Sequence, residues 1–121
     1  RDRVAALRQT HRGTEAARRL LLDVDVLASP TTPIPATPIG QETIAYGGTE
    51  ESVTAALIRC TAPFNFTRLP ALSLPCGFTG EGLPVGLQLA GRPFDEATVL
   101  RAGHAYERAT DWHRRRPREL G

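Results

Sequence analysis

Apolar residues recur at helical intervals at both ends of the chain. In residues 2–22 arginines separate them, which predicts an amphipathic helix with a basic exposed face, weakened at Gly13. Near the other end, Asp95 is a favourable N-cap for a second helix that runs to about Thr110. The residues predicted to face inward are Val4, Leu7, Ala17, Leu20 and Leu21 in the first helix, and Val99, Leu100, Gly103 and Tyr106 in the second.

A third helix is predicted in the middle of the chain, over residues 50–60. Thr49, which follows Gly47 and Gly48, is a favourable N-cap, and the two glutamates after it fall where the helix dipole stabilises anions. One apolar stripe follows at Val53, Ala56, Leu57 and Cys60. The sequence PFNF at residues 63–66 then indicates a turn region.

Three short segments alternate apolar and polar residues with the period of a β-strand. The first covers residues 23–30, where two valines alternate with two aspartates before Pro30 ends the strand. The second and third cover residues 72–76 and 85–89, and the glycine-rich turn between them predicts a β-hairpin. Pro75 has no N–H to donate, so the second strand lies at a sheet edge or ends there.

Helices and strands in this order predict an α/β fold with an incomplete sheet. Three strands leave uncovered edges, whereas a sheet averages about five or six strands. Residues 30–48 carry four prolines, which predicts an extended loop of a length that is uncommon inside a small self-contained domain. The sequence also contains no methionine. We therefore expect the chain to be one end of a larger domain, whose translation does not begin at Arg1.

The composition is that of a globular protein, with 121 residues of which 40% are hydrophobic and 23% charged. No segment has the roughly 18 apolar residues of a membrane helix or the apolar centre of a signal peptide, so we expect no membrane contact and a cytoplasmic location. A net charge of +2 without a basic face argues against nucleic acid as a partner. The arginine-rich tail, residues 114–118, is interpreted as a solvated terminus, with a nucleic-acid or anionic-lipid patch as the alternative.

No active site follows from composition and spacing alone. The three serines, Ser29, Ser52 and Ser73, are isolated, and none lies in a Gly-x-Ser-x-Gly nucleophile elbow. Cys60 and Cys76 have neither metal-ligand spacing nor the density of a disulfide scaffold, although Cys76 at a strand end is a weaker candidate nucleophile. The three histidines are scattered, so we predict no metal site and no cofactor.

Four segments of the sequence closely resemble the C-terminal end of amidase signature enzymes. They are DVLASPTTP at residues 25–33, TAPFNFTRLPALSLPCG at 61–77, GLPVGLQL at 82–89 and GRPFDE at 91–96. The resemblance runs from about residue 20 to residue 113, with the same order and spacing of segments. It implies that residues 1–121 are the C-terminal part of a single amidase domain. They would supply the last strands and the closing helix of a mixed sheet between helical layers.

The resemblance also implies a chemistry. Amidase signature enzymes hydrolyse a carboxylic amide to an acid and ammonia or an amine. They use a serine nucleophile, a second serine with a cis peptide that relays the proton, and a lysine base. Those groups lie around a Gly-Gly-Ser-Ser signature that is absent from this sequence. With no lysine and three isolated serines, no residue here matches a catalytic group, so we expect this chain alone to be inactive.

What the resemblance does transfer to this chain is one wall of the substrate pocket. Thr32 after the proline-rich strand, and Thr61, Phe64 and Asn65 around the Pro-Phe-Asn segment, resemble pocket-lining positions and are the predicted substrate-binding residues. The alternatives are a turn residue for Asn65 and a core residue for Phe64. Near Ile58, the transamidosome proteins of this family, which deliver ammonia to charged transfer RNA, carry an acidic residue, and its absence favours a general amidase.

The predicted partners are therefore a small-molecule amide substrate and the remainder of the amidase domain, with a homodimer as a further candidate assembly. The competing hypothesis is a stand-alone, non-catalytic interaction module, which would bind a protein partner through the uncovered sheet edge and the proline-rich loop. An upstream, in-frame Gly-Gly-Ser-Ser signature with a lysine would support the enzyme. A start codon directly before Arg1 would support the module.

Overall fold

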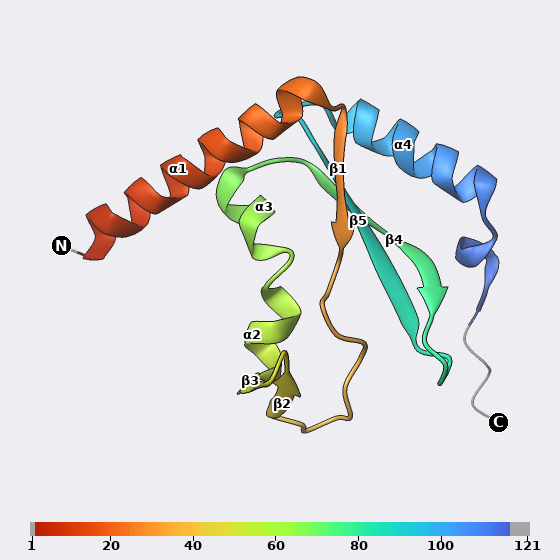
Figure 1. Cartoon of the computed structure of the whole chain (residues 1–121). Helices are drawn as coiled ribbons and strands as arrows, with labels where there is room; N and C mark the ends of the chain where they lie inside the picture. The colour runs from red at the N-terminus through yellow and green to blue at the C-terminus, as the bar shows by residue number, and fades with distance from the viewer. Residues whose placement is uncertain (1, 117–121) are drawn as a thin grey trace.

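The computed structural model describes residues 2–116, and of residues 2–12 and Tyr46 it describes the backbone. Helix α1 (Asp2–Asp23) leads into strand β1 (Val26–Pro30), and a long loop then reaches the hairpin of β2 (Thr43–Tyr46) and β3 (Thr49–Ser52). Helices α2 (Val53–Ile58) and α3 (Ala62–Thr67), strands β4 (Ala71–Phe78) and β5 (Pro84–Gly91), helix α4 (Glu96–Ala109) and the 3-10 turn η1 (Trp112–Arg114) follow. Figure 1 shows α1 extending away from the sheet and α4 lying beside it.

Strands β1, β5 and β4 form an antiparallel sheet in that order. The β4–β5 pair confirms the predicted hairpin, with Leu72 opposite Leu89 and a turn at residues 79–83. Within the described part of the chain β4 is an edge strand, as Pro75 predicted. Cys76 is the extra residue of a β-bulge near the end of this strand.

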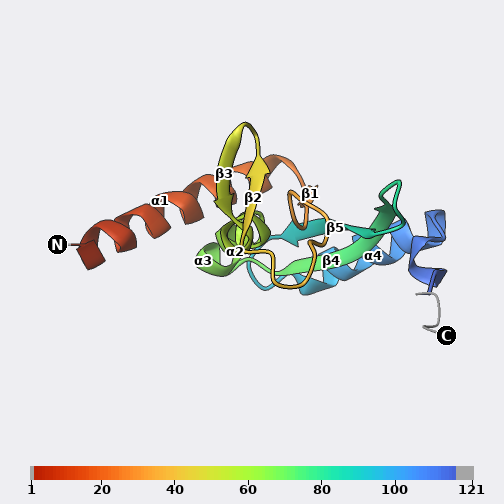
Figure 2. The ribbon, with the colours of Figure 1, turned by 90° about the horizontal axis from the view of Figure 1, so that it is seen from below.

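Helix α4 covers one face of this sheet (Figure 1, Figure 2). Its N-cap is Asp95, as predicted, and the Asp95 carboxylate accepts a hydrogen bond from the Thr98 backbone N–H at 3.3 Å. Between helix and sheet lies a buried apolar core of Leu74, Leu89 and Val99. Gly103 allows the helix to approach the sheet closely, because a Cβ at this position would lie 2.5 Å from Leu72 Cδ2.

Two residues that were predicted to face inward are exposed. Leu100 is 59% exposed because it follows the core residue Val99 by about 100° of helical rotation. Leu20 is exposed for the same reason beside the buried Leu21. The inward prediction is confirmed for the remaining members that the structure describes, which are Ala17, Leu21, Val99, Gly103 and Tyr106. Val4 and Leu7 lie outside the described side chains.

Arg92 determines where α1 ends. Its Nε donates to the Leu21 carbonyl at 2.9 Å and its Nη2 to the Val24 carbonyl at 3.1 Å. Its Nη1 pairs with Asp25 at 3.2 Å. The two carbonyls belong to the last turn of the helix and to the residue just beyond it, where intrahelical partners run out. The helix therefore continues to Asp23 and β1 begins after Asp25, so the predicted strand start at residue 23 is wrong and the two aspartates share no strand face.

The predicted helix over residues 50–60 is wrong in its first part, and the predicted loop over residues 30–48 contains a strand. Residues 49–52 form β3, which pairs with β2. Gly47 and Gly48 make the two-residue turn with φ angles of 62° and 81°, the signs that a type I′ hairpin turn requires at both central positions. This turn outweighs the N-cap signal of Thr49, and the helix begins only at Val53.

Two short helices follow the hairpin. The apolar stripe is confirmed for Val53 and Ala56, which α2 buries. Helix α3 then occupies the Pro-Phe-Asn segment, so the predicted turn region is wrong there. Pro63 lies in the first turn of α3, where a missing N–H costs no hydrogen bond, and Arg68 ends the helix with a φ of 56°. Helix α3 lies against α1 (Figure 1).

The fold class is α/β, as predicted, and the surface is that of a partial domain. The chain exposes 9326 Å², whereas a compact protein of 13.1 kDa exposes about 6,400 Å². The exposed side chains include large apolar ones such as Phe94 (96%) and Leu22 (78%). In residues 2–116, β1 and β4 each have one unpaired edge. No helix in that part of the chain has both the length and the apolar character needed to cross a membrane.

Candidate functional site

A row of three polar side chains crosses the sheet face that is turned away from α4. Ser29 of β1 and Ser73 of β4 both lie opposite Gln88 of the central strand β5. Directly opposed residues in an antiparallel sheet share a face, and residues one step along a strand point to the other face. Leu74 and Leu89, each one step along from a member of the row, pack into the α4 core. The polar row therefore occupies the opposite face.

Gln88 is the centre of this row. The residue is 4% exposed, and its Nε2 donates hydrogen bonds to Ser29 Oγ and to the Cys60 carbonyl, both at 3.1 Å. Cys60 lies in the connection between α2 and α3, where backbone carbonyls run out of intrahelical partners. One buried carboxamide therefore links the central strand to β1 and to the beginning of α3.

The chain that leaves β1 is fixed at a second point of the same sheet. The Thr31 backbone N–H donates to the Gly86 carbonyl at 2.9 Å, and the Thr31 hydroxyl lies 2.7 Å from Ser73 Oγ. Position 86 has no room for a side chain, because a Cβ there would lie 2.7 Å from Thr31 Oγ1 and 2.9 Å from Thr31 Cβ. The loop after β1 therefore starts from an anchored residue, and Thr32 comes directly after it.

The structure brings three of the four predicted substrate-binding residues together at α3. The Thr61 carbonyl accepts hydrogen bonds from the backbone N–H groups of Phe64 at 3.1 Å and Asn65 at 3.4 Å. Phe64 is half-buried, while Asn65 is exposed and its side chain makes no described hydrogen bond within residues 2–116. Thr32 lies on the separate β1 loop, where its hydroxyl donates to the Ile34 carbonyl at 2.8 Å. The two segments are connected indirectly, through Gln88.

The polar row and the segments bonded to it have the chemistry of a ligand-binding surface rather than of a catalytic centre. Its hydrogen bonds join hydroxyls, one carboxamide and backbone groups, and in the described part of the chain none involves a basic side chain that could activate Ser29 or Ser73. Cys76, the weaker candidate nucleophile, is a half-buried bulge residue with a free thiol. Within residues 2–116 no group of three His, Cys, Asp or Glu side chains could hold a metal ion.

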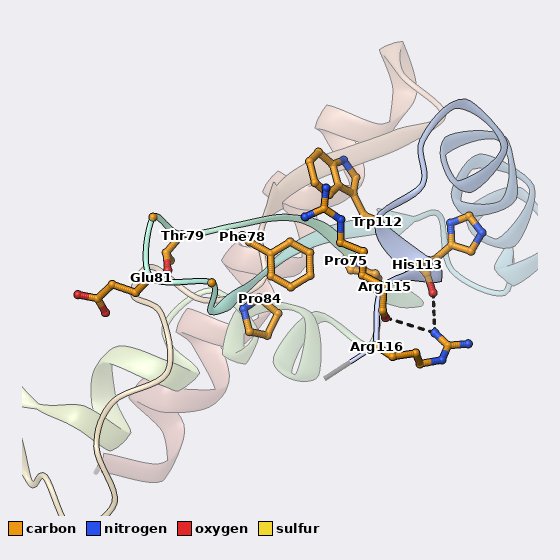
Figure 3. A pocket seen from close by; sticks show the side chains of 11 residues that line it. Pro75, Phe78, Thr79, Glu81, Pro84, Trp112, His113, Arg115 and Arg116 are labelled. Carbon is orange, nitrogen blue, oxygen red and sulfur yellow. Dashed lines mark hydrogen bonds between the residues drawn. The ribbon is translucent and has the colours of Figure 1, made fainter. Parts of the chain in front are cut away.

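A hollow that was not predicted from the sequence lies between the turn of the β4–β5 hairpin and η1 (Figure 3). It has a volume of about 800 Å³, and none of the predicted substrate-binding residues lines it. The Arg115 guanidinium carbon lies 5.1 Å from the ring centroid of Phe78 and 4.7 Å from that of Trp112. Aromatic rings therefore hold this arginine of the predicted solvated tail. Arg118, in the same tail, lies outside the described residues.

Comparison with known proteins places these features in a family. The Amidase family model matches residues 3–100. The A-type subunit of the glutamyl-tRNA(Gln) amidotransferase of Chloroflexus aggregans is 55% identical over 96 residues, which are 78% of this chain and 18% of that protein. An amidase of Pseudomonas putida is 50% identical over 99 residues, which are 81% of this chain and 21% of that protein. The solved structure of 6-aminohexanoate cyclic dimer hydrolase matches with a TM-score of 0.82 at 28% identity, over 98% of this chain and 26% of its own.

This chain is part of a larger α/β domain, because its sheet is open at both edges within residues 2–116 and because it covers only 26% of the solved structure that it matches. The chain belongs to the amidase signature family. It spans about a fifth of the length of the curated relatives that it matches. The resemblance carried by residues 25–96 is thereby confirmed, and the relatives share the chemistry of amide C–N bonds.

Proposed function

We propose that residues 1–121 are the C-terminal part of a single amidase domain. The complete domain hydrolyses a carboxylic amide to an acid and ammonia or an amine. It uses the serine, cis-serine and lysine groups of the family, all of which lie outside this chain. The observation that carries the proposal is the family match over residues 3–100, in a chain that spans about a fifth of its relatives and contains no lysine.

The serines of this chain are unsuited to start the reaction. A serine hydroxyl is almost entirely neutral at pH 7, and a resonance-stabilised amide is attacked only when a base stands beside the nucleophile. Ser29 contacts the Gln88 carboxamide and Ser73 contacts the Thr31 hydroxyl, neither of which is a base. The chain therefore contributes scaffold and one side of the pocket.

The four predicted substrate-binding residues supply the mixture of surfaces that a neutral amide requires. Phe64 offers a half-buried ring to an apolar acyl group, and the exposed Asn65 carboxamide can both donate and accept hydrogen bonds. The hydroxyls of Thr32 and Thr61 donate to backbone carbonyls at 2.8 and 3.2 Å, which leaves their oxygen lone pairs as acceptors. These groups support a small-molecule amide as the ligand.

A second candidate function is that of the family member in a glutamyl-tRNA(Gln) amidotransferase, because the Chloroflexus aggregans protein of that name is 55% identical to this chain. Ile58 argues against it. The resemblance puts an acidic residue near this position in such proteins, whereas here an exposed apolar side chain ends α2. We therefore favour a general amidase.

The test replaces the matching segment of the Pseudomonas putida amidase, 21% of that protein, with the complete 121-residue chain. We expect this chimaera to release ammonia from members of a panel of aliphatic and aryl amides. We expect no release by the chain alone or by the amidase lacking the segment. Activity restricted to amino-acid amides would favour the amidotransferase function. A folded but inactive chimaera, or turnover by the chain alone that is lost in Ser73→Ala or Cys76→Ala, would refute the proposal.

A further inference from the structure

We propose that Gln88 is a positioning residue of the substrate pocket. Its side-chain carboxamide holds the loop after β1 and the start of α3 in fixed positions relative to strand β5. The inference rests on the proposed function, since these two segments are pocket walls only within a complete amidase. Gln88 makes no described hydrogen bond to the side chains of the predicted substrate-binding residues. Its proposed role is therefore to position the segments that carry them.

The burial of Gln88 requires an explanation. It lies at 4% exposure in the central strand, where a carboxamide is unfavourable unless its donors are paired. Both hydrogen bonds of Nε2 reach distant parts of the sequence, Ser29 at a separation of 59 residues and Cys60 at 28 residues. A side chain that served only to fill the sheet face could be apolar, so the observed pairing indicates a linking role.

Each acceptor lies beside a predicted pocket wall. Cys60 directly precedes Thr61, whose carbonyl begins the hydrogen bonding of α3. Ser29 lies three residues before Thr32, and the intervening Thr31 is bonded to Gly86, two residues from the glutamine. Both walls are therefore attached to strand β5, and their relative position depends on it. If the carboxamide is lost, the α3 wall loses its described hydrogen bond to β5, while the β1 wall keeps the pairing of residues 26–30 with β5 and the two contacts of Thr31.

Carboxamide chemistry is required at this position. Glutamate has nearly the same shape, but its carboxylate only accepts hydrogen bonds. The Cys60 carbonyl would lose its donor and face a second acceptor, whereas the Ser29 hydroxyl could turn its own hydrogen toward the carboxylate. Leucine would leave both acceptors without their donor. Asparagine keeps the donors but is one methylene shorter, so it cannot span both acceptors from the same backbone position.

The experiment introduces Gln88→Glu into the chimaera and compares it with Gln41→Glu. Gln41 is a matched control because it is exposed and its Nε2 donates to one carbonyl nearby, that of Thr43, at 2.9 Å. For an amide with a bulky acyl group we expect Gln88→Glu to lower kcat/KM about 100-fold, since a small misplacement of a pocket wall has effects of this size. For acetamide, which reaches the walls little, we expect a loss below about tenfold, and for Gln41→Glu changes within about twofold on both substrates.

Two further variants separate positioning from general damage. Ser29→Ala removes one of the two acceptors and should give an intermediate loss, and its combination with Gln88→Leu should be less than additive. If Gln88→Glu lowers the yield of folded protein, Gln88→Asn provides the same comparison with a neutral side chain. Equal losses on the two amides, or no loss on either, would overturn the positioning role.

Hydrogen exchange supplies a readout that does not depend on turnover. In Gln88→Glu the backbone N–H groups of residues 61–67, except Pro63, should exchange faster, with a smaller change at Thr31, whose N–H donates to Gly86, while Gln41→Glu leaves both segments unchanged. An inactive unsubstituted chimaera refutes the proposed function, and exchange then still decides whether Gln88 holds the two segments. An active chimaera whose exchange is unaffected by Gln88→Glu refutes the positioning role and leaves the proposed function intact.

Discussion

Separated from the rest of an amidase, the 121-residue chain is expected to self-associate rather than to behave as a stable monomer. Its exposed area of 9326 Å² exceeds that of a compact protein of the same mass by about 2,900 Å². The largest apolar patch of a typical monomer is about 300–600 Å², and a standard interface buries about 1,600 Å² in total. The excess belongs to one chain and combines polar with apolar area, and it is larger than the roughly 800 Å² that each partner contributes to a standard interface. Within residues 2–116 the open edges of β1 and β4 add unpaired backbone groups to it.

Size-exclusion chromatography with light scattering, and a thermal melt followed by circular dichroism, test this expectation. The chain alone should elute as higher-order species and melt over a broad range, whereas the chimaera should not. Leu22→Ser combined with Phe66→Ser removes two exposed apolar side chains and should shift the chain alone toward smaller species. A monomer with a sharp, cooperative transition above about 60 °C, in the upper part of the mesophile range, would refute the reasoning.

Three substitutions in the chimaera test individual contacts by denaturant unfolding. Gly86→Ala should lower the free energy of unfolding by about 1–3 kcal/mol because its Cβ would collide with Thr31. Gly80→Ala, which has nothing within 4 Å, is the control and should have no effect, so equal stability of the two variants would contradict the close approach at Gly86. Arg92→Lys keeps the charge but loses the planar guanidinium that donates to two carbonyls. Because the side chain is 41% exposed, we expect the free energy of unfolding to fall by about 1–2 kcal/mol, and an unchanged denaturation midpoint would exclude a role for Arg92 in holding the end of α1. Gly13→Ala, exposed within α1 and surrounded by open space, should stabilise by about 0.5–1 kcal/mol and raise the helical signal, and a loss of helix would contradict this.

The elements that could be predicted from the sequence are those with strong local signals. The Asp95 cap with its apolar period sufficed for α4, and the glycine-rich turn sufficed for the β4–β5 hairpin. The segment around Thr49 carried two competing local signals, a helix cap and a Gly-Gly turn. The turn prevails because both glycines adopt positive φ angles, which the paired strands on either side then hold in place.

The polar row could not have been predicted in the same way. Alternation assigns Gln88 and Ser73 to one face of their strands, but only the strand order β1-β5-β4 brings Ser29 and Ser73 to opposite sides of Gln88. The hydrogen bond to Cys60 further depends on where α2 ends, a boundary that the sequence pattern placed incorrectly. The four substrate-binding residues rest on the family resemblance and stay predictions.

The stack of Arg115 with Phe78 and Trp112 gives the chain a built-in optical reporter. Trp112 is the sole tryptophan of the sequence, and its ring centroid lies 6.2 Å from that of Phe78. The blue segment that follows α4 and contains η1 lies at the end of the molecule away from α1 (Figure 1). Indole fluorescence from the isolated chain therefore originates at one point, where η1 meets the turn end of the β4–β5 hairpin. Fraying at this point would wet the indole and shift its emission to the red, whereas detachment of α1 would leave the emission unchanged. Tryptophan fluorescence therefore distinguishes fraying at η1 from detachment of α1, two changes that circular dichroism does not separate.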